Sequence, residues 1–113
     1  MANFITRVEL HKADNRTVTK EDYDILHEEM KANGFKTTIV SSDNKTYHLL
    51  TAEYDRSTDK LLADVLADAK TAASKVVSRS LNVKNYSAFV AEYAMASWTN
   101  LEEVKPVFKR PGY

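Results

Sequence analysis

The chain has 113 residues, of which 43% are hydrophobic and 28% are charged, so its length and composition suit one folded domain. Sixteen lysines and arginines balance sixteen aspartates and glutamates, which excludes a polybasic protein that attracts nucleic acid through its overall charge. Without cysteine there can be no disulfide bond or thiol catalysis, and without a signal peptide or a long apolar run we expect a cytoplasmic protein with no membrane partner.

Residues 4–10 predict a β-strand, because hydrophobic and polar side chains alternate along them. One face of this strand would carry Phe4, Thr6, Val8 and Leu10. The other face would carry Ile5, Arg7, Glu9 and His11. The second face therefore holds the charged groups.

A helix is expected after a polar connection over residues 12–18. Thr19 is a suitable N-cap, and Asp22 three residues later completes a capping box. Asn33 and Gly34 predict the end of this helix in a left-handed C-cap. The apolar positions at helical spacing are Tyr23, Ile25, Leu26 and Met30.

A hairpin and a second helix are predicted next. Residues 35–41 and 46–54 have strand character, residues 42–45 supply the turn, and residues 55–58 break the pattern. The longest periodic segment of the chain follows and ends at Arg79. Its predicted buried face consists of Leu62, Val65, Leu66, Ala69, Ala73 and Val76.

The last strand is predicted over residues 86–93. Residues 96–104 fit either a short helix or an edge strand, and residues 105–113 predict a flexible tail, so the domain is expected to span residues 1–104. The order β-α-β-β-α-β predicts an α+β, ferredoxin-like fold, in which two helices cover one face of a four-stranded antiparallel sheet.

Three histidines are the first candidates for chemistry. They lack the spacing of a metal site, so we expect no metal and no other cofactor. His27 is expected as a half-exposed histidine on the first helix. His11 and His48 fall on the first and third strands, which are neighbours in the predicted sheet, so they could act as acid and base or merely occupy the sheet surface.

A second group consists of Arg7, Glu9 and His11, with Asp14 just beyond them. Metal-free RNA cleavage needs a base for the 2′-hydroxyl, an acid for the leaving oxygen and a cation for the phosphorane. The histidine, glutamate and arginine could fill these roles. The alternative is that the charged members form ordinary ion pairs on the open face of the sheet.

A basic stretch lies in the second half of the chain. Residues 70–91 contain four basic residues and no acidic residue. Lys70, Lys75 and Arg79 on the second helix could bind RNA phosphates, or could simply complement the negative end of the helix dipole.

Four segments together resemble a known family. They are residues 3–11 (NFITRVELH), the helix end at Gly34 and Phe35, residues 46–54 (TYHLLTAEY) and residues 69–75 (AKTAASK). In this order they resemble small bacterial proteins grouped with the GhoS-type endoribonuclease antitoxins. The resemblance implies a ferredoxin-like fold related to small CRISPR-associated nucleases, and a type V antitoxin that cleaves the messenger RNA of a membrane toxin. Those nucleases carry an aspartate at the end of the first strand, where this chain has His11.

Two functions follow as hypotheses. The first is a cytoplasmic protein that binds or processes single-stranded RNA, with Arg7, Glu9, His11 and His48 as catalytic candidates. The second is a non-catalytic module that forms a homodimer or binds a protein partner through its open sheet face or a strand edge.

Overall fold

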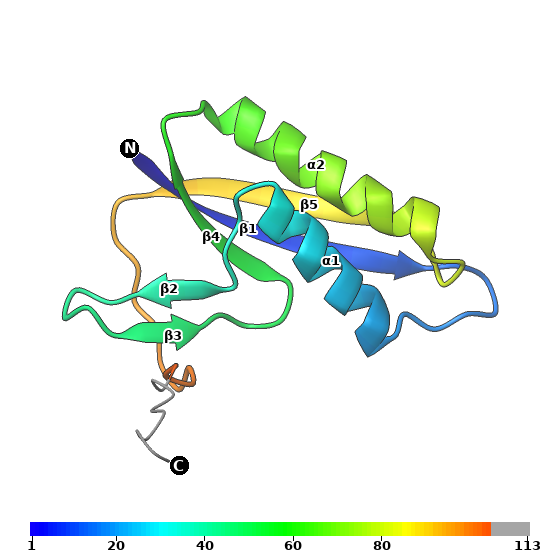
Figure 1. Ribbon diagram of the computed structural model, residues 1–113, viewed down its shortest axis with the longest axis horizontal. Helices are drawn as coiled ribbons and strands as arrows, with labels where there is room; N and C mark the ends of the chain where they lie inside the picture. Colours follow the sequence, from blue (N-terminus) through cyan, green and yellow to red (C-terminus); the bar gives the residue numbers. More distant parts are fainter. Residues whose placement is uncertain (105–113) are drawn as a thin grey trace, which may run out of the picture.

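The computed structural model describes residues 1–104, and the predicted tail over residues 105–113 lies outside the described residues. A three-stranded antiparallel sheet has both helices on one face, and a two-stranded sheet lies beside it (Figure 1). The α+β class and the placement of the helices are therefore confirmed. The larger sheet has the strand order β4 (Glu53–Thr58), β1 (Ala2–Lys12), β5 (Val83–Tyr93). The smaller sheet pairs β2 (Thr38–Val40) with β3 (Thr46–His48). The helices are α1 (Lys20–Ala32) and α2 (Leu62–Arg79).

β1 is the central strand of the larger sheet, and it runs antiparallel to both neighbours. The predicted alternation of this strand is confirmed, because every second side chain lies beneath the helices. Those side chains are Phe4, Thr6, Val8 and Leu10, all at most 5% exposed. The alternation of the sequence therefore fixes which side of β1 the helices cover.

α1 begins and ends where the sequence predicts. The side chain of Thr19 accepts a hydrogen bond from the backbone of Asp22, whose carboxylate accepts one from the Thr19 N–H at 2.8 Å. At the other end Gly34 adopts a φ of +92°, and the N–H of Phe35 donates to the carbonyl of Met30 at 3.1 Å. This bond between residues five apart is the Schellman C-cap that glycine permits.

The buried face of α2 differs from the prediction at two positions. Leu62 is 48% exposed and Leu66 is only half-buried, so both predicted core positions were wrong. α2 starts at Leu62, and its contact with the core begins one turn later. The buried stripe is Val65, Ala69, Ala72, Ala73 and Val76, whose small alanines allow close approach of the helix to the sheet and to α1.

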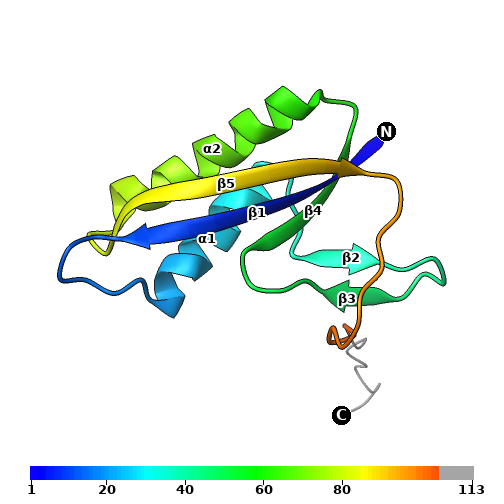
Figure 2. The same ribbon diagram turned by 180° about the vertical axis from the view of Figure 1, so that it is seen from behind.

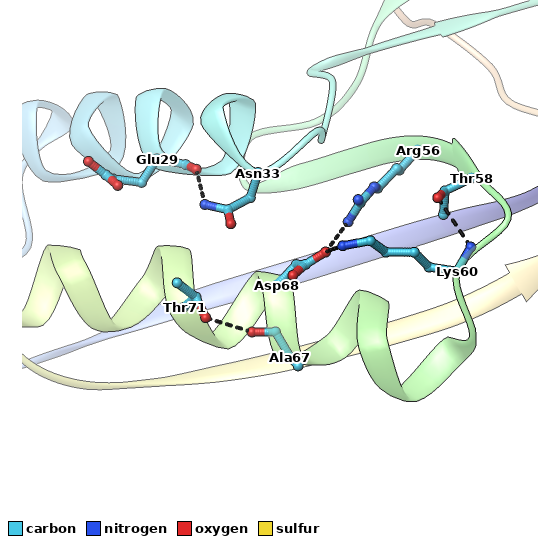
Figure 3. Close-up of polar contacts among 8 residues, drawn as sticks. All are labelled: Glu29, Asn33, Arg56, Thr58, Lys60, Ala67, Asp68 and Thr71. Carbon is cyan, nitrogen blue, oxygen red and sulfur yellow. Dashed lines mark hydrogen bonds and ion pairs between the residues drawn. The ribbon is translucent and has the colours of Figure 1, made fainter.

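Ion pairs connect α2 to β4 and to the residues that follow this strand. The carboxylate of Asp68 accepts from Arg56 at 2.8 Å and from Lys60 at 2.9 Å (Figure 3). Burial alone would raise the pKa of Asp68, but the two cations outweigh it and lower that pKa. The Arg56 guanidinium also lies 5.0 Å from the ring centre of Phe35, so this arginine is held on the covered face of the sheet.

The predicted third strand is divided in two. Ala52 adopts a φ of +66°, and the N–H of Glu53 donates to the carbonyl of Leu50, so the chain turns sharply between β3 and β4. Residues 55–58, predicted as a break, are instead part of β4 and pair with β1 as far as Thr58.

This division replaces the predicted four-stranded sheet by a sheet of three strands and a sheet of two. One bridge connects the two sheets, where the backbones of Lys36 and Asp55 exchange two hydrogen bonds of 2.8 Å. Residues 102–104 run beside β3, where the N–H of His48 donates to the carbonyl of Glu102 at 2.8 Å. The end of the described chain is therefore closer to the predicted edge strand than to a helix.

Candidate functional site

One face of the larger sheet is not covered by the helices. Figure 2 shows β4, β1 and β5 in front of α1 and α2, so this uncovered face points to the viewer. We call it the open face. By strand register its side chains are Asn3, Ile5, Arg7, Glu9 and His11 of β1, Glu53, Asp55 and Ser57 of β4, and Asn85, Ser87, Phe89, Ala91 and Tyr93 of β5.

Arg7 lies at the middle of the open face. It is directly opposite Glu53 on β4 and Phe89 on β5. Arg7 and Glu9 are exposed, and within residues 1–104 neither forms an ion pair. Phe89 is 65% exposed, which is unusual for a large aromatic side chain in the middle of a strand. The site therefore combines an unpaired cation with an accessible ring.

His11 lies on the same face near the end of β1. Its Nε2 is 2.7 Å from the hydroxyl oxygen of Ser87 on β5, and the ring is half-buried. The structure thus brings three predicted site residues, Arg7, Glu9 and His11, onto one row. Alternate residues of a strand are about 6.7 Å apart, so this row spans about 13 Å.

His48 does not join this row. It pairs with Thr38 in the two-stranded sheet, and the pairing of β4 with β1 starts only at Glu53. Both views place β3 far from the end of β1 that carries His11 (Figures 1 and 2). The expectation that the strand segment bearing His48 neighbours the first strand was therefore wrong, because the turn at Ala52 directs β3 away from β1.

The predicted phosphate-binding residues lie on the helix layer, away from the open face. The Nζ of Lys75 and the guanidinium of Arg79 contact the carboxylate of Glu29 on α1, at 3.5 Å and 3.2 Å. Lys70 lies five residues before Lys75, which is about 140° around the helix. The basic side chains of α2 therefore face different directions, and two of them already have an anionic partner.

A cleft of about 880 Å³ lies at the end of the open face that adjoins the two-stranded sheet. Asn3, Asp55 and Tyr93 from the open face line it, together with Tyr47 and Trp98. The rings of Tyr47 and Trp98 meet edge to face, with centres 5.5 Å apart. Sequence patterns did not indicate this cleft, because its walls come from distant parts of the chain.

A hydrogen bond links Tyr93 to Asp55 in the lining of this cleft. The Tyr93 hydroxyl donates to the Asp55 carboxylate. Burial raises the pKa of Tyr93, and the bond to Asp55 and the charge of that carboxylate raise it further. The hydroxyl consequently stays protonated at neutral pH and fixes the orientation of Asp55.

His27 contacts a buried tyrosine behind the sheet. Its Nδ1 is 2.7 Å from the hydroxyl of Tyr54, which has no exposed surface. Burial lowers the pKa of His27, so the ring is neutral at neutral pH, and burial raises the pKa of Tyr54. The predicted partial exposure of His27 is confirmed, but its bond to Tyr54 was not foreseen.

Two further observations concern the described residues. Over residues 1–104, no three histidine, aspartate or glutamate side chains are gathered closely enough to hold a metal ion. In that same range, neither helix has the length and apolar character needed to cross a membrane.

Comparison with known proteins gave no match to a protein-family model, to a curated protein or to a solved structure.

Proposed function

We propose that this is a cytoplasmic protein that binds and processes single-stranded RNA on its open face, in the manner of the GhoS-type antitoxins that its sequence resembles. The observation that carries the proposal is the exposed Phe89 directly opposite Arg7, which forms no ion pair with any other residue of the range 1–104. Single-stranded RNA presents unstacked bases and phosphates together, and a ring beside a guanidinium matches that combination.

The neighbouring side chains suit the same ligand. Phe89 offers a ring on which a base can stack, an interaction worth about 1–3 kcal/mol. Arg7 can form paired hydrogen bonds with a phosphate. Asn85 and Ser87 on the same face of β5 provide polar groups for the edges of bases.

The proposal includes cleavage of the bound strand without a metal ion. His11, held by Ser87, would take the proton of the 2′-hydroxyl, and Arg7 would stabilise the charge of the phosphorane. Glu9 lies between them in the row and, in its protonated form, would give a proton to the 5′-oxygen as the bond from phosphorus to that oxygen breaks and a 2′,3′-cyclic phosphate forms. His48 takes no part in this arrangement, because β3 lies outside the larger sheet.

The test is RNA binding by variants of the open face. Phe89→Ala should weaken binding of a labelled single-stranded RNA roughly 5- to 150-fold, which corresponds to the loss of one stacked base. Arg7→Ala should weaken binding and reduce the salt dependence by about one phosphate contact. The matched controls are Leu81→Ala, an exposed apolar side chain outside the sheet, and Arg16→Ala in the β1–α1 connection. Equal affinities for all five proteins would overturn the proposal.

We also propose that the fold is a variant of the ferredoxin-like arrangement with a detached edge strand. The support is the bridge between Lys36 and Asp55, which places the start of the β2 segment beside β4. The strand order would then read β2-β4-β1-β5, with the two helices as crossovers on one face.

The second candidate function is a homodimer formed through the open face. Glu53 lies opposite Arg7 on β4, and Glu9 lies two residues after Arg7 on β1, so two copies related by a two-fold axis could pair each arginine with a partner glutamate. Sedimentation would then show a dimer that Arg7→Glu dissociates and that the double exchange Arg7→Glu with Glu53→Arg restores. A monomer at all concentrations would remove this candidate.

A further inference from the structure

The cleft at the end of the open face has the size and lining of a ligand site. Its volume of about 880 Å³ lies within the range of about 300–1,000 Å³ that is usual for sites of small organic ligands. Tyr47 and Trp98 line it, together with the hydrogen-bonded pair of Asp55 and Tyr93 from the open face, which we call its floor. Aromatic side chains facing fixed hydrogen-bonding groups are the combination that selects a flat, polar ring.

The floor of the cleft is part of the open face. Asn3 and Asp55 project from the same side of the sheet as Arg7, and Asn3 lies four residues before Arg7 on β1. Four residues of a strand span about 13 Å, so a strand of RNA held at Arg7 and Phe89 can reach the cleft with a nearby base. The cleft is therefore positioned as a base pocket beside the proposed RNA surface.

We propose that the cleft binds a guanine base, stacked on the ring of Trp98 and hydrogen-bonded to Asp55. This inference rests on the proposed function, because it names the base that the RNA site selects.

The choice of guanine follows from the polar groups on the floor. Asp55 is an acceptor, and the hydroxyl of Tyr93 holds its carboxylate in place. Of the four RNA bases, only guanine presents two parallel N–H donors, at N1 and N2, to one carboxylate. Lys36, which pairs with Asp55 through the backbone and also lines the cleft, can donate to the adjacent O6. Adenine, cytosine and uracil can each give the carboxylate only one N–H donor from the edge that faces it, so one carboxylate oxygen would lose its partner.

Trp98 provides a direct measurement, because it is the single tryptophan of the chain and lines the cleft. Titration with GMP should quench its fluorescence to saturation. AMP, CMP and UMP should bind at least about tenfold more weakly, because each of them lacks a hydrogen bond to the charged carboxylate that GMP forms. Asp55→Asn should remove this preference for GMP. Lys36→Gln, at an exposed position where folding is not at risk, should weaken GMP binding selectively. Asp64→Asn, the same change as in the Asp55 variant but at an exposed position in the first turn of α2, should leave GMP binding unchanged.

The outcomes separate this inference from the proposed function. If single-stranded RNA binds in a Phe89-dependent manner but the four nucleotides quench Trp98 equally or not at all, the guanine pocket is overturned and the RNA surface stands. If GMP quenches selectively but single-stranded RNA does not bind, the proposed function is overturned and the cleft is a site for a free guanine nucleotide. If RNAs differing only by one G in a uridine strand bind with equal affinity, the link between the cleft and the RNA surface is overturned.

Discussion

Asp22 connects the start of α1 to the end of α2, and its substitution by asparagine should reveal how much this connection stabilises the fold. The side chain is only 4% exposed. Its carboxylate accepts hydrogen bonds from the N–H and the hydroxyl of Thr19, from the Ser80 hydroxyl, and from the Asn82 amide at 3.2 Å. The first two bonds cap α1, and the other two come from the connection between α2 and β5.

The expected cost of Asp22→Asn follows from these bonds. An asparagine keeps one acceptor and can donate to the Ser80 hydroxyl, so most bonds survive, but they lose their charge. Hydrogen bonds to a charged group contribute about 1.5–3 kcal/mol and neutral ones about 0.5–1.5 kcal/mol. The loss of a negative charge at a helix N-terminus costs a further 0.3–1 kcal/mol, approximately. Because the bonds share one carboxylate and are not additive, we expect a loss of about 2–3 kcal/mol in the free energy of unfolding.

This loss should depend on pH. Burial would raise the pKa of Asp22, but the hydrogen bonds from Ser80, Thr19 and Asn82 outweigh burial and lower it. A carboxylate whose pKa is lower in the folded state stabilises the protein above the unfolded pKa of about 3.9, and this contribution disappears as the pH falls through the folded value. The difference between the parent and Asp22→Asn should therefore be full at neutral pH and shrink below about pH 4.

Urea unfolding at a series of pH values measures both effects. Asp24→Asn is the matched control, because Asp24 is an exposed residue of the same helix whose ion pair with Lys20 spans 3.4 Å. It should change stability by less than about 0.5 kcal/mol. A loss below about 1 kcal/mol for Asp22→Asn at neutral pH, or a loss that persists unchanged in acid, would contradict the network described above.

Three further predictions concern packing and charge. In urea unfolding, Val76→Ala should lower the free energy of unfolding by about 2–3 kcal/mol and Leu66→Ala by only about 1 kcal/mol, because Val76 is fully buried whereas Leu66 is half-buried. The reverse order would show that the buried face of α2 is misassigned. Tyr54→Phe should lower the free energy of unfolding by about 1–2 kcal/mol, because it removes the hydrogen-bond partner of Nδ1 of His27, and it should introduce no charge at neutral pH. An unchanged melting curve would contradict this. Lys70→Glu should leave the affinity for single-stranded RNA unchanged, since this residue lies on the helix layer and not on the open face, and a clear loss in a binding titration would place RNA on α2 instead.

Local signals predicted the elements whose ends depend on nearby residues. Thr19 and Asp22 are three residues apart, and Gly34 follows its helix directly, so both caps of α1 were visible in the sequence. The alternation in β1 was equally readable, and it correctly placed Arg7 and His11 on one face. These parts of the fold and site required no knowledge of distant contacts.

The remaining features depend on contacts between distant residues. Ala52 adopts a left-handed conformation that its residue type does not indicate, so the break between β3 and β4 was missed. Arg56 lies on the covered side of the sheet, where its guanidinium pairs with Asp68 and lies over the ring of Phe35. A charged residue at a position that faces the helices hid the alternation of hydrophobic and polar residues in β4. The cleft unites residues from both ends of the chain, from Asn3 to Trp98, and no spacing rule connects them.

The central position of β1 has a consequence for the order in which the protein acquires its structure. The two neighbours of β1 are residues 53–58 and residues 83–93, so β1 is synthesised before both of its partners and is paired on both edges only after β5 has been made. Until then one edge of β1 keeps its backbone groups unpaired, and Phe4 and Val8 lack the complete sheet around them. Sheets whose strands pair over long sequence distances fold slowly and form intermediates with exposed hydrophobic surface. Nascent chains that stall before β5 is synthesised should therefore aggregate or bind chaperones more than complete chains do.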